Sequence, residues 1–323
     1  MATSHDVLPA ALAPPPAEAA LPIVPRRRPG RAVAAVLALI AVGLLLGSVA
    51  RNRAFQWDVV GRYLTSTAIL DGLVLTLWLT AAVMALGFAL GTLLAAARLS
   101  GNPVLSALSW GYVWVFRAAP LLVQLLFWFN IGALYPRLSL GVPYGPELFG
   151  VRTVDLLGPT ATAVVGLTLH EAAFAAEVVR AGILSVDQGQ LEAAQSLGLR
   201  RTRVLRRIVL PQAMRSIVPT AGNMLVGTLK GTSIVSVLAV HDLLFSAQLI
   251  YNRTYQVIPL LLVATLWYIA VTSVLSAGQY YLERYFARGT SRGALPPTPP
   301  ARLRAALAAL AALASRRRRE AVR

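Results

Sequence analysis

Long apolar runs, separated by short polar and basic segments, dominate the chain. Each run is a predicted transmembrane span, because a helix needs about 20 mostly apolar residues to cross about 30 Å of hydrocarbon. Residues 73–97 and 257–282 carry no charge and are the clearest spans. The pattern predicts an all-α polytopic membrane bundle of six spans, at residues 32–50, 73–97, 121–134, 156–179, 216–240 and 257–282.

The first span follows a cluster of four arginines, as the apolar core of a secretory signal peptide would. A signal peptide has a shorter apolar core and then small residues at a cleavage site. Here Arg51 and Arg53 come directly after the apolar run. The sequence therefore predicts an uncleaved membrane anchor.

The third span has an interrupted beginning. Residues 104–116 are apolar, but Arg117 and Pro120 separate them from the apolar run at 121–134. Because proline is tolerated in the first turn of a helix, we expect the span to begin near Pro120, with Arg117 close to a membrane boundary.

Composition supports a membrane protein. Of the 323 residues, 57% are hydrophobic and 13% are charged, whereas soluble domains carry about 25% charged residues. The formal net charge is nevertheless +17, with 29 arginines beside the single Lys230. Nucleic-acid binding would also explain that sign, so the location of the charge decides its meaning.

The arginines fall mostly on one side of a six-span arrangement. With both termini in the cytoplasm, inner segments hold 23 of them and outer segments hold six. Short cytoplasmic loops of membrane proteins collect Arg and Lys, so this orientation is predicted. The charge is dispersed over the inner segments, without an aromatic platform for stacked bases, which argues against nucleic acid.

Several polar residues lie inside the predicted spans. Glu171 is nine residues from Arg180, about 13 Å along a helix, which places it toward the middle of the bilayer. A carboxylate there needs a partner or water. Two partners stay open: a substrate ammonium or guanidinium group, or Lys230. The candidate translocation path comprises Gln124, Glu171, Lys230, Thr232 and Ser233.

The largest inner loop, residues 185–211, has the pattern of two short helices. Asp187 can cap the first helix, and Gly198 has the backbone freedom to end it. Leu191, Ala194 and Leu197 recur at helical spacing, and the small side chain of Ala193 lets another surface approach. The second helix is basic, and we expect Pro211 to end it.

This loop resembles the EAA loop of ABC importer permeases. The matching positions are Glu192, Ala193 and Ala194, then Gly198 after three residues, Ile208 after nine more, and Leu210 and Pro211 after one. The resemblance implies that the loop is the coupling helix that docks on a cytoplasmic ATPase. The open alternative is an interfacial helix that only covers the end of the bundle.

Three further segments are similar to the polar amino acid uptake subfamily of these permeases. They are Phe116 to Leu125, with Arg117, Pro120 and Gln124; Ala175 to Ile183, with Glu177 and Arg180; and Leu229 to Ser236. A structural role is expected for the first two motifs, and Glu177 and Arg180 share a helix face and can pair. The resemblance implies a type I importer permease core of five spans, to which this chain adds one N-terminal span.

Composition and the extent of the resemblance together give the organisation, and the resemblance implies the partners. We expect a disordered Pro/Ala-rich cytoplasmic tail at 1–30, an extra span with an outer segment at 31–64, the permease domain at 65–286, and a basic cytoplasmic tail at 287–323. Expected partners are ABC ATPase subunits, an extracytoplasmic amino-acid-binding protein, a second permease subunit as homodimer or heterodimer, and the lipids of a bacterial plasma membrane.

Several kinds of chemistry have no residues in this chain. It contains no cysteine and no phosphate-loop motif, so we expect no metal site and no cofactor, with ATP bound by the partner. It has none of the usual hydrolase or dinucleotide motifs, so it is predicted not to be an enzyme. An ion- or proton-coupled secondary transporter is the alternative function, although it leaves the EAA spacing unexplained.

Overall fold

The computed structural model describes residues 29–141 and 147–286 and divides into two units, residues 1–55 and 56–323. The predicted tails lie outside the described residues, except that Pro29 and Gly30 begin the first helix. That first unit contains α1 (Pro29–Arg51) and the 3-10 helix η1 (Arg53–Phe55). The side chains described in α1 are almost all exposed although they are apolar, as expected of a helix in lipid.

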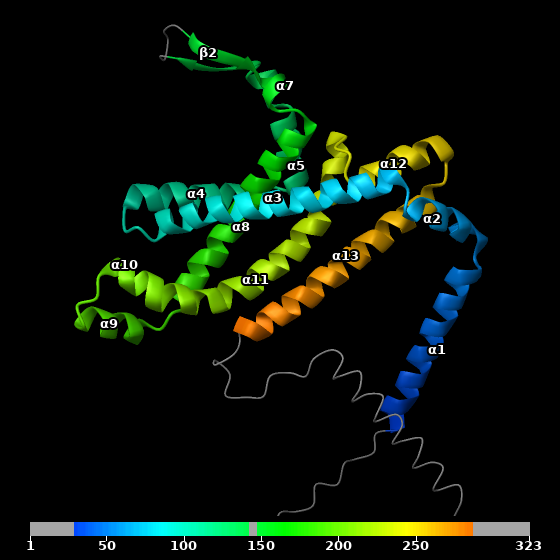
Figure 1. The fold of residues 1–323 in the computed structure, drawn as a ribbon, viewed down its shortest axis with the longest axis horizontal. Helices are drawn as coiled ribbons and strands as arrows, with labels where there is room; N and C mark the ends of the chain where they lie inside the picture. The colour runs from blue at the N-terminus through cyan, green and yellow to red at the C-terminus, as the bar shows by residue number, and fades with distance from the viewer. Residues whose placement is uncertain (1–28, 142–146, 287–323) are drawn as a thin grey trace, which may run out of the picture. The chain divides into compact units, whose positions relative to one another are not determined.

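The second unit is a helical bundle with one small hairpin (Figure 1). Its helices are α2 (Trp57–Leu64), α3 (Thr67–Arg98), α4 (Pro103–Ala118), α5 (Leu121–Phe129), α6 (Ile131–Leu134), α7 (Thr153–Leu156), α8 (Pro159–Leu184), α9 (Gln188–Ser196), α10 (Arg201–Val204), the π-helical η2 (Leu205–Val209), α11 (Leu210–Gly231), the 3-10 helix η3 (Thr232–Leu238), α12 (Leu243–Thr254) and α13 (Val257–Phe286).

The predicted spans are recovered as four unbroken helices and two bent pairs. Among the described residues, α1, α3, α8 and α13 are long and apolar enough to cross a membrane. The other two spans correspond to α4 with α5 and to the α10–η3 run with α12. The all-α bundle predicted from the sequence is therefore confirmed.

The third span is not the continuous helix expected over residues 121–134. Helices α4 and α5 meet at an angle of 103°, and α5 ends at Phe129. Ala119, directly before Pro120, has φ −81° and ψ 135°. A proline ring clashes with a helical conformation of the preceding residue, so the backbone is extended there and the helix direction changes.

The expectation that Pro211 ends the basic helix is also wrong. Helical structure continues from Arg201 to Gly231, with Pro211 in the first turn of α11. The turn before it is π-helical, and the amide of Leu210 donates to the carbonyl of Leu205. This wider turn changes the hydrogen-bond register ahead of Pro211. Proline has no backbone N–H, and the first turn of a helix tolerates that absence.

Helices α3 and α8 approach each other closely through small residues. A Cβ atom added at Gly91 would lie 2.6 Å from the Cβ of Ala175 and 2.8 Å from the backbone nitrogen of Ala176. One at Gly87 would lie 3.1 Å from the Cβ of Glu171. Membrane helices pack by van der Waals contact rather than by hydrophobic exclusion, so small residues at the contact let the backbones come together.

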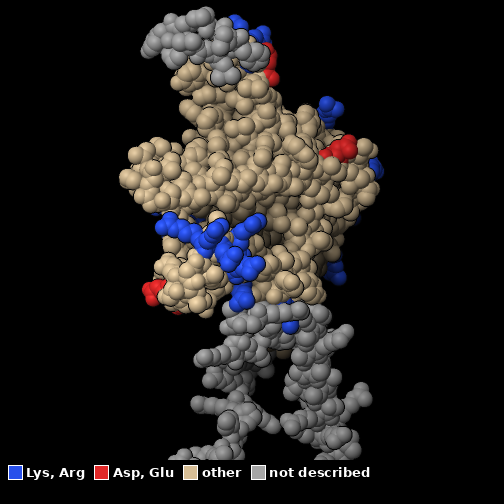
Figure 2. Space-filling view, turned by 60° about the vertical axis from the view of Figure 1, so that its left-hand side comes forward, with Lys and Arg blue, Asp and Glu red and all other residues tan. Residues whose placement is uncertain are grey.

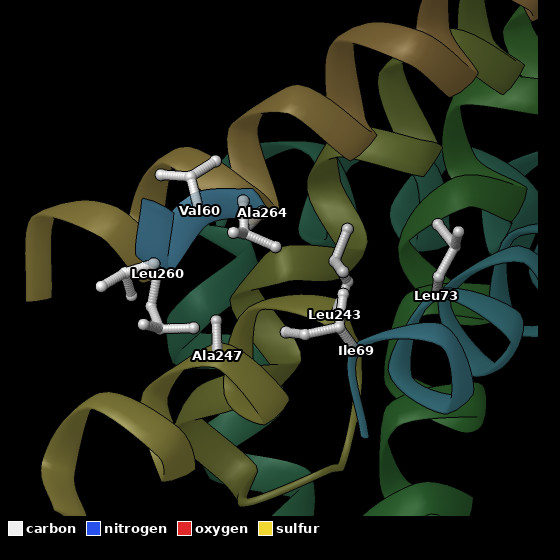
Figure 3. Close-up of a cluster of buried hydrophobic side chains, with 9 residues drawn as sticks. Val60, Ile69, Leu73, Leu243, Ala247, Leu260 and Ala264 are labelled. Atoms are coloured by element: carbon white, nitrogen blue, oxygen red, sulfur yellow. The ribbon is translucent and has the colours of Figure 1, made fainter. Parts of the chain in front are cut away.

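A second packing centre joins the ends of four helices (Figure 3). Its buried side chains come from α2, α3, α12 and α13: Val59, Val60, Ile69, Leu73, Leu243, Ala247, Leu260, Val263 and Ala264. Hydrogen bonds fix the beginning of α12 in the same region. Thr76 on α3 accepts from the amide of Leu243 at 3.0 Å, and Asp242 caps α12 by accepting from the amide of Phe245 at 2.9 Å.

The sequence did not indicate the antiparallel hairpin formed by β1 (Arg137–Gly141) and β2 (Glu147–Arg152). Arg137 pairs with Arg152 at its base, with an irregularity between Leu140 and Gly141. Next to the hairpin, the Thr153 hydroxyl donates to the carbonyl of Tyr135 and holds α7 against the start of β1. Within the described part of the chain, β1 and β2 of this hairpin are the β-strands.

Substitution of Gly91 should test the α3–α8 contact. Gly91→Ala places a methyl group against the backbone of α8, and overpacking of this kind destabilises by about 1–3 kcal/mol. We expect a lower midpoint of thermal unfolding for the detergent-solubilised protein. Gly111→Ala in α4 is the matched control, because nothing lies within 4 Å of its added Cβ. Equal midpoints for the two variants would contradict the proposed packing.

Candidate functional site

The segment with the EAA spacing begins with a capped helix, as predicted. The Asp187 side chain accepts from the backbone amide of Gln190 at 3.3 Å and caps α9. Gly198 has φ +67°, a left-handed conformation that favours glycine, and it ends the helix. The amide of Leu199 then donates to the carbonyl of Ala194 at 3.2 Å, which directs the chain toward α10.

One side of α9 packs on the bundle and another side is open. Ala194 is 2% exposed, and Leu191 packs against a cluster of Val186, Val209, Ala213 and Ile217. Leu197, by contrast, is 78% exposed. The predicted common face of Leu191, Ala194 and Leu197 is therefore divided between an inner contact and an outward apolar side chain.

A hollow of about 310 Å³ lies between α9 and the following helices. Three of the EAA positions, Ala193, Ala194 and Ile208, line it, together with Asp187, Gly189, Gln190, Leu197 and Leu199. Small side chains and a backbone turn form its walls. Such a hollow, beside an exposed leucine, can receive an apolar side chain of another protein.

The segment that follows α9 is rich in arginine. Arg200, Arg201, Arg203, Arg206 and Arg207 are all exposed on α10, η2 and the residue before them. Figure 2 shows a group of basic side chains on one face of the molecule. The helices after α9 therefore present several basic side chains to their surroundings.

The predicted Glu177–Arg180 pair is present at the end of α8. The Arg180 Nη2 atom donates to the Glu177 Oε2 atom at 2.7 Å. Arg98, the last residue of α3, places its Nη1 atom 3.6 Å from the Glu177 Oε1 atom. The carboxylate thus joins α3 to α8, and the side chains of all three residues are 24–29% exposed.

Gln124 lies at the break between α4 and α5. Its side-chain nitrogen donates to the carbonyl oxygens of Phe116, at 2.9 Å, and Ala119, at 2.7 Å. These are carbonyls that the bend leaves without helical partners. Its Oε1 atom is buried and has no hydrogen-bond partner within the described residues. Arg117 lies just before the bend, with its guanidinium 5.2 Å from the centre of the Phe174 ring.

Glu171 does not pair with Lys230. Across residues 29–141 and 147–286, no ion pair joins these two side chains, and Lys230 is exposed. Thr228 on α11 is the polar side chain that interacts with the half-buried Glu171 carboxylate, and its hydroxyl donates to the carbonyl of Met224 at 2.9 Å. Thr228 was not expected at this position from the sequence, although it lies on the same helix as Lys230.

Thr232 and Ser233 follow Lys230 in η3, where each hydroxyl donates to a nearby carbonyl. Thr232 is buried and donates to Leu229 at 2.7 Å, and Ser233 donates to Lys230 at 2.8 Å. These bonds satisfy carbonyls at the change from α-helix to 3-10 helix. The structure therefore brings Thr228, rather than Thr232 or Ser233, to Glu171.

A cavity of about 650 Å³ was not foreseen either. It lies among α2, α3 and α12, far along α3 from Arg98, and its polar lining includes Tyr63, Asp71, His241, Ser246 and Arg253. No sequence motif joins these residues, because they come from separate segments of the chain.

Comparison with known proteins identifies the family. Residues 87–288 match the family described as binding-protein-dependent transport system inner membrane component. The chain belongs to this family. Its described spans and this membership make it a multi-pass inner-membrane protein and the permease subunit of an ABC importer, as the EAA spacing indicated.

Similar curated proteins are named as amino acid permeases. The arginine transport system permease protein ArgU of Corynebacterium glutamicum is 41% identical over 269 residues, which cover 83% of this chain and 84% of that protein. The L-cystine transport system permease protein TcyL of Bacillus subtilis is 34% identical over 221 residues, covering 68% and 87%. These names give no support to the alternative of a proton-coupled secondary transporter.

Solved structures of ABC transporters share the fold of this permease. The crystal structure of an amino acid ABC transporter with histidines has a TM-score of 0.57 and 31% identity, and the match covers 68% of this chain and 94% of the other. An inward-facing structure of the MetNI methionine transporter has a TM-score of 0.51 at 20% identity, covering 68% and 96%, and supports the fold alone.

Proposed function

We propose that this permease carries a polar amino acid with a cationic side chain, such as arginine, into the cell. The 41% identity to an arginine permease over most of both chains supports the substrate class. The proposal is supported by Glu171, a half-buried carboxylate in α8 that has no basic partner in the described part of the chain. A carboxylate inside a membrane bundle favours a cation beside it.

A separate ATPase supplies the energy in this proposal. The chain has no phosphate-loop motif, and α9 with its hollow and exposed Leu197 has the form of a docking helix. Glu192, Ala193, Ala194, Gly198, Ile208, Leu210 and Pro211 are the proposed coupling residues. The ATPase binds the ATP, so this subunit needs no cofactor of its own.

The assembly contains further subunits. A second permease subunit, either another copy or a relative, completes the path, and an extracytoplasmic binding protein delivers the amino acid. These are the general partners of binding-protein-dependent transport systems, and the family membership supports them. Gln124, Lys230, Thr232 and Ser233 stay predicted path residues.

Both termini face the cytoplasm in this proposal. The basic segment around α10 and the arginines of both tails then lie inside, and the hairpin β1–β2 lies outside. The excess of arginine in the inner segments supports this orientation.

The role of Glu171 is tested by Glu171→Gln in the reconstituted transporter. We expect arginine uptake to fall about tenfold or more, and glutamine uptake to fall much less, because a hydrogen bond to a charged group contributes about 1.5–3 kcal/mol. Glu283→Gln in the last turns of α13 is the control and should leave both unchanged. Equal losses for the two substrates, or no loss for either, would refute charge recognition by Glu171.

Docking of the ATPase is tested by Leu197→Asp. The exposed leucine makes few contacts within the chain, so folding should persist, while a charge in the apolar contact should lower ATPase affinity roughly tenfold or more. Co-purification of the ATPase and its stimulated ATP hydrolysis measure the effect. Gln195→Asp, an exposed change two residues earlier in α9, is the matched control. Unchanged co-purification of Leu197→Asp would exclude this surface.

The orientation is tested with single cysteines, since the chain has none. Ser139→Cys in β1 should react with a membrane-impermeant maleimide in intact cells. Ser196→Cys in α9 should react only after the membrane is permeabilised. Both serines are exposed, so access to the thiol depends on sidedness. The reverse labelling pattern would contradict the proposed topology.

A further inference from the structure

A second pocket lies where α3 ends, between α4 and α8, and the transport proposal does not use it. Its volume is about 510 Å³. The lining combines charged and aromatic side chains: Arg98, Trp110, Val113, Trp114, Arg117, Ala118, Phe174 and Glu177.

Positive charge exceeds negative charge at this pocket. Glu177 is the single carboxylate in the lining, and Arg98, Arg117 and the neighbouring Arg180 surround it. Arg180 already occupies one carboxylate oxygen at 2.7 Å, and Arg98 approaches the other at 3.6 Å. The guanidinium of Arg117 lies over the face of Phe174. One carboxylate therefore balances one of three guanidinium charges, and an anion would balance another.

Two tryptophans make the opening of the pocket amphipathic. The rings of Trp110 and Trp114 are parallel, with centroids 6.2 Å apart, and the residues are 54% and 61% exposed. Tryptophan is enriched where a membrane protein meets the headgroup region, because its ring is apolar and its N–H is polar. Apolar exposed residues of α4, such as Leu108 and Val115, extend from the same helix.

We propose that this pocket binds the phosphate group of an anionic membrane lipid such as phosphatidylglycerol. Arg98 and Arg117 contact the phosphate oxygens, since guanidinium groups match phosphate geometry. Trp110 and Trp114 cover the glycerol and the first acyl carbons. The bound headgroup links α4 to the α3–α8 contact. None of the proposed path residues Gln124, Glu171, Lys230, Thr232 and Ser233 lines this pocket, and the proposal rests on the membrane location of the chain rather than on the identity of the substrate.

Native mass spectrometry of the full-length permease, with lipids added to the delipidated protein, tests the site. We expect phosphatidylglycerol to be retained in preference to phosphatidylcholine. Arg117→Gln should lower the affinity for phosphatidylglycerol about fivefold, which corresponds to about 1 kcal/mol. Arg117→Lys should retain most of the affinity for phosphatidylglycerol. Arg62→Gln in α2, an exposed arginine outside this pocket, should have no effect.

Several outcomes would overturn the proposal. One is equal retention of phosphatidylglycerol and phosphatidylcholine. Another is an equal loss of affinity for phosphatidylglycerol in Arg117→Gln and Arg62→Gln. The third is an unchanged affinity for phosphatidylglycerol in Arg117→Gln. Retention of inorganic phosphate without a preference for phosphatidylglycerol would indicate a free-anion site instead. Should Arg117→Gln unfold, Trp114→Ala replaces it, because that exposed ring can be removed without opening the core. Trp114→Ala is then expected to lower the affinity for phosphatidylglycerol by the same factor.

Discussion

The close contact between α3 and α8 is the interaction on which the rest of the structure depends. Lipid tails are as apolar as leucine, so they do not drive these helices together, and the contact relies on van der Waals packing at short range. Gly87 and Gly91 on α3 and Ala175 and Ala176 on α8 allow it. The contact sets the positions of Glu171, next to Gly87, and of Glu177, which reaches Arg98 at the end of α3.

The same helix pair connects the bundle to α9. Helix α8 ends at Leu184, and the buried Val186 follows within two residues, packed with Val209, Ala213 and Ile217 of the η2–α11 region. Leu191 of α9 packs against this cluster. Helix α9 is therefore in direct side-chain contact with the segments that follow α8 and begin α11. Those two helices carry Glu171 and Thr228, so the proposed coupling segment and the proposed substrate contact are built on neighbouring helices.

Local features were predictable from the sequence, and features that depend on distant contacts were not. The Asp187 cap, the Gly198 helix end and the Glu177–Arg180 pair involve residues no more than three or four positions apart. The continuity through Pro211 was missed because a π-helical turn has no clear sequence pattern. Pro120 predicts the beginning of a helix, but the same proline also restricts Ala119 and thereby bends the span. Thr228 was missed as the neighbour of Glu171 because only tertiary packing brings α11 to α8.

In the proposed transport cycle, ATP hydrolysis on a partner acts through α9 and drives transport through this subunit. The most direct test is amino acid uptake into proteoliposomes that contain the complete complex, with ATP enclosed and the proton gradient collapsed by an ionophore. We expect uptake to require ATP and the ATPase subunit and to continue without the gradient. Uptake that persists without nucleotide, or that stops when the gradient collapses, would contradict the claim.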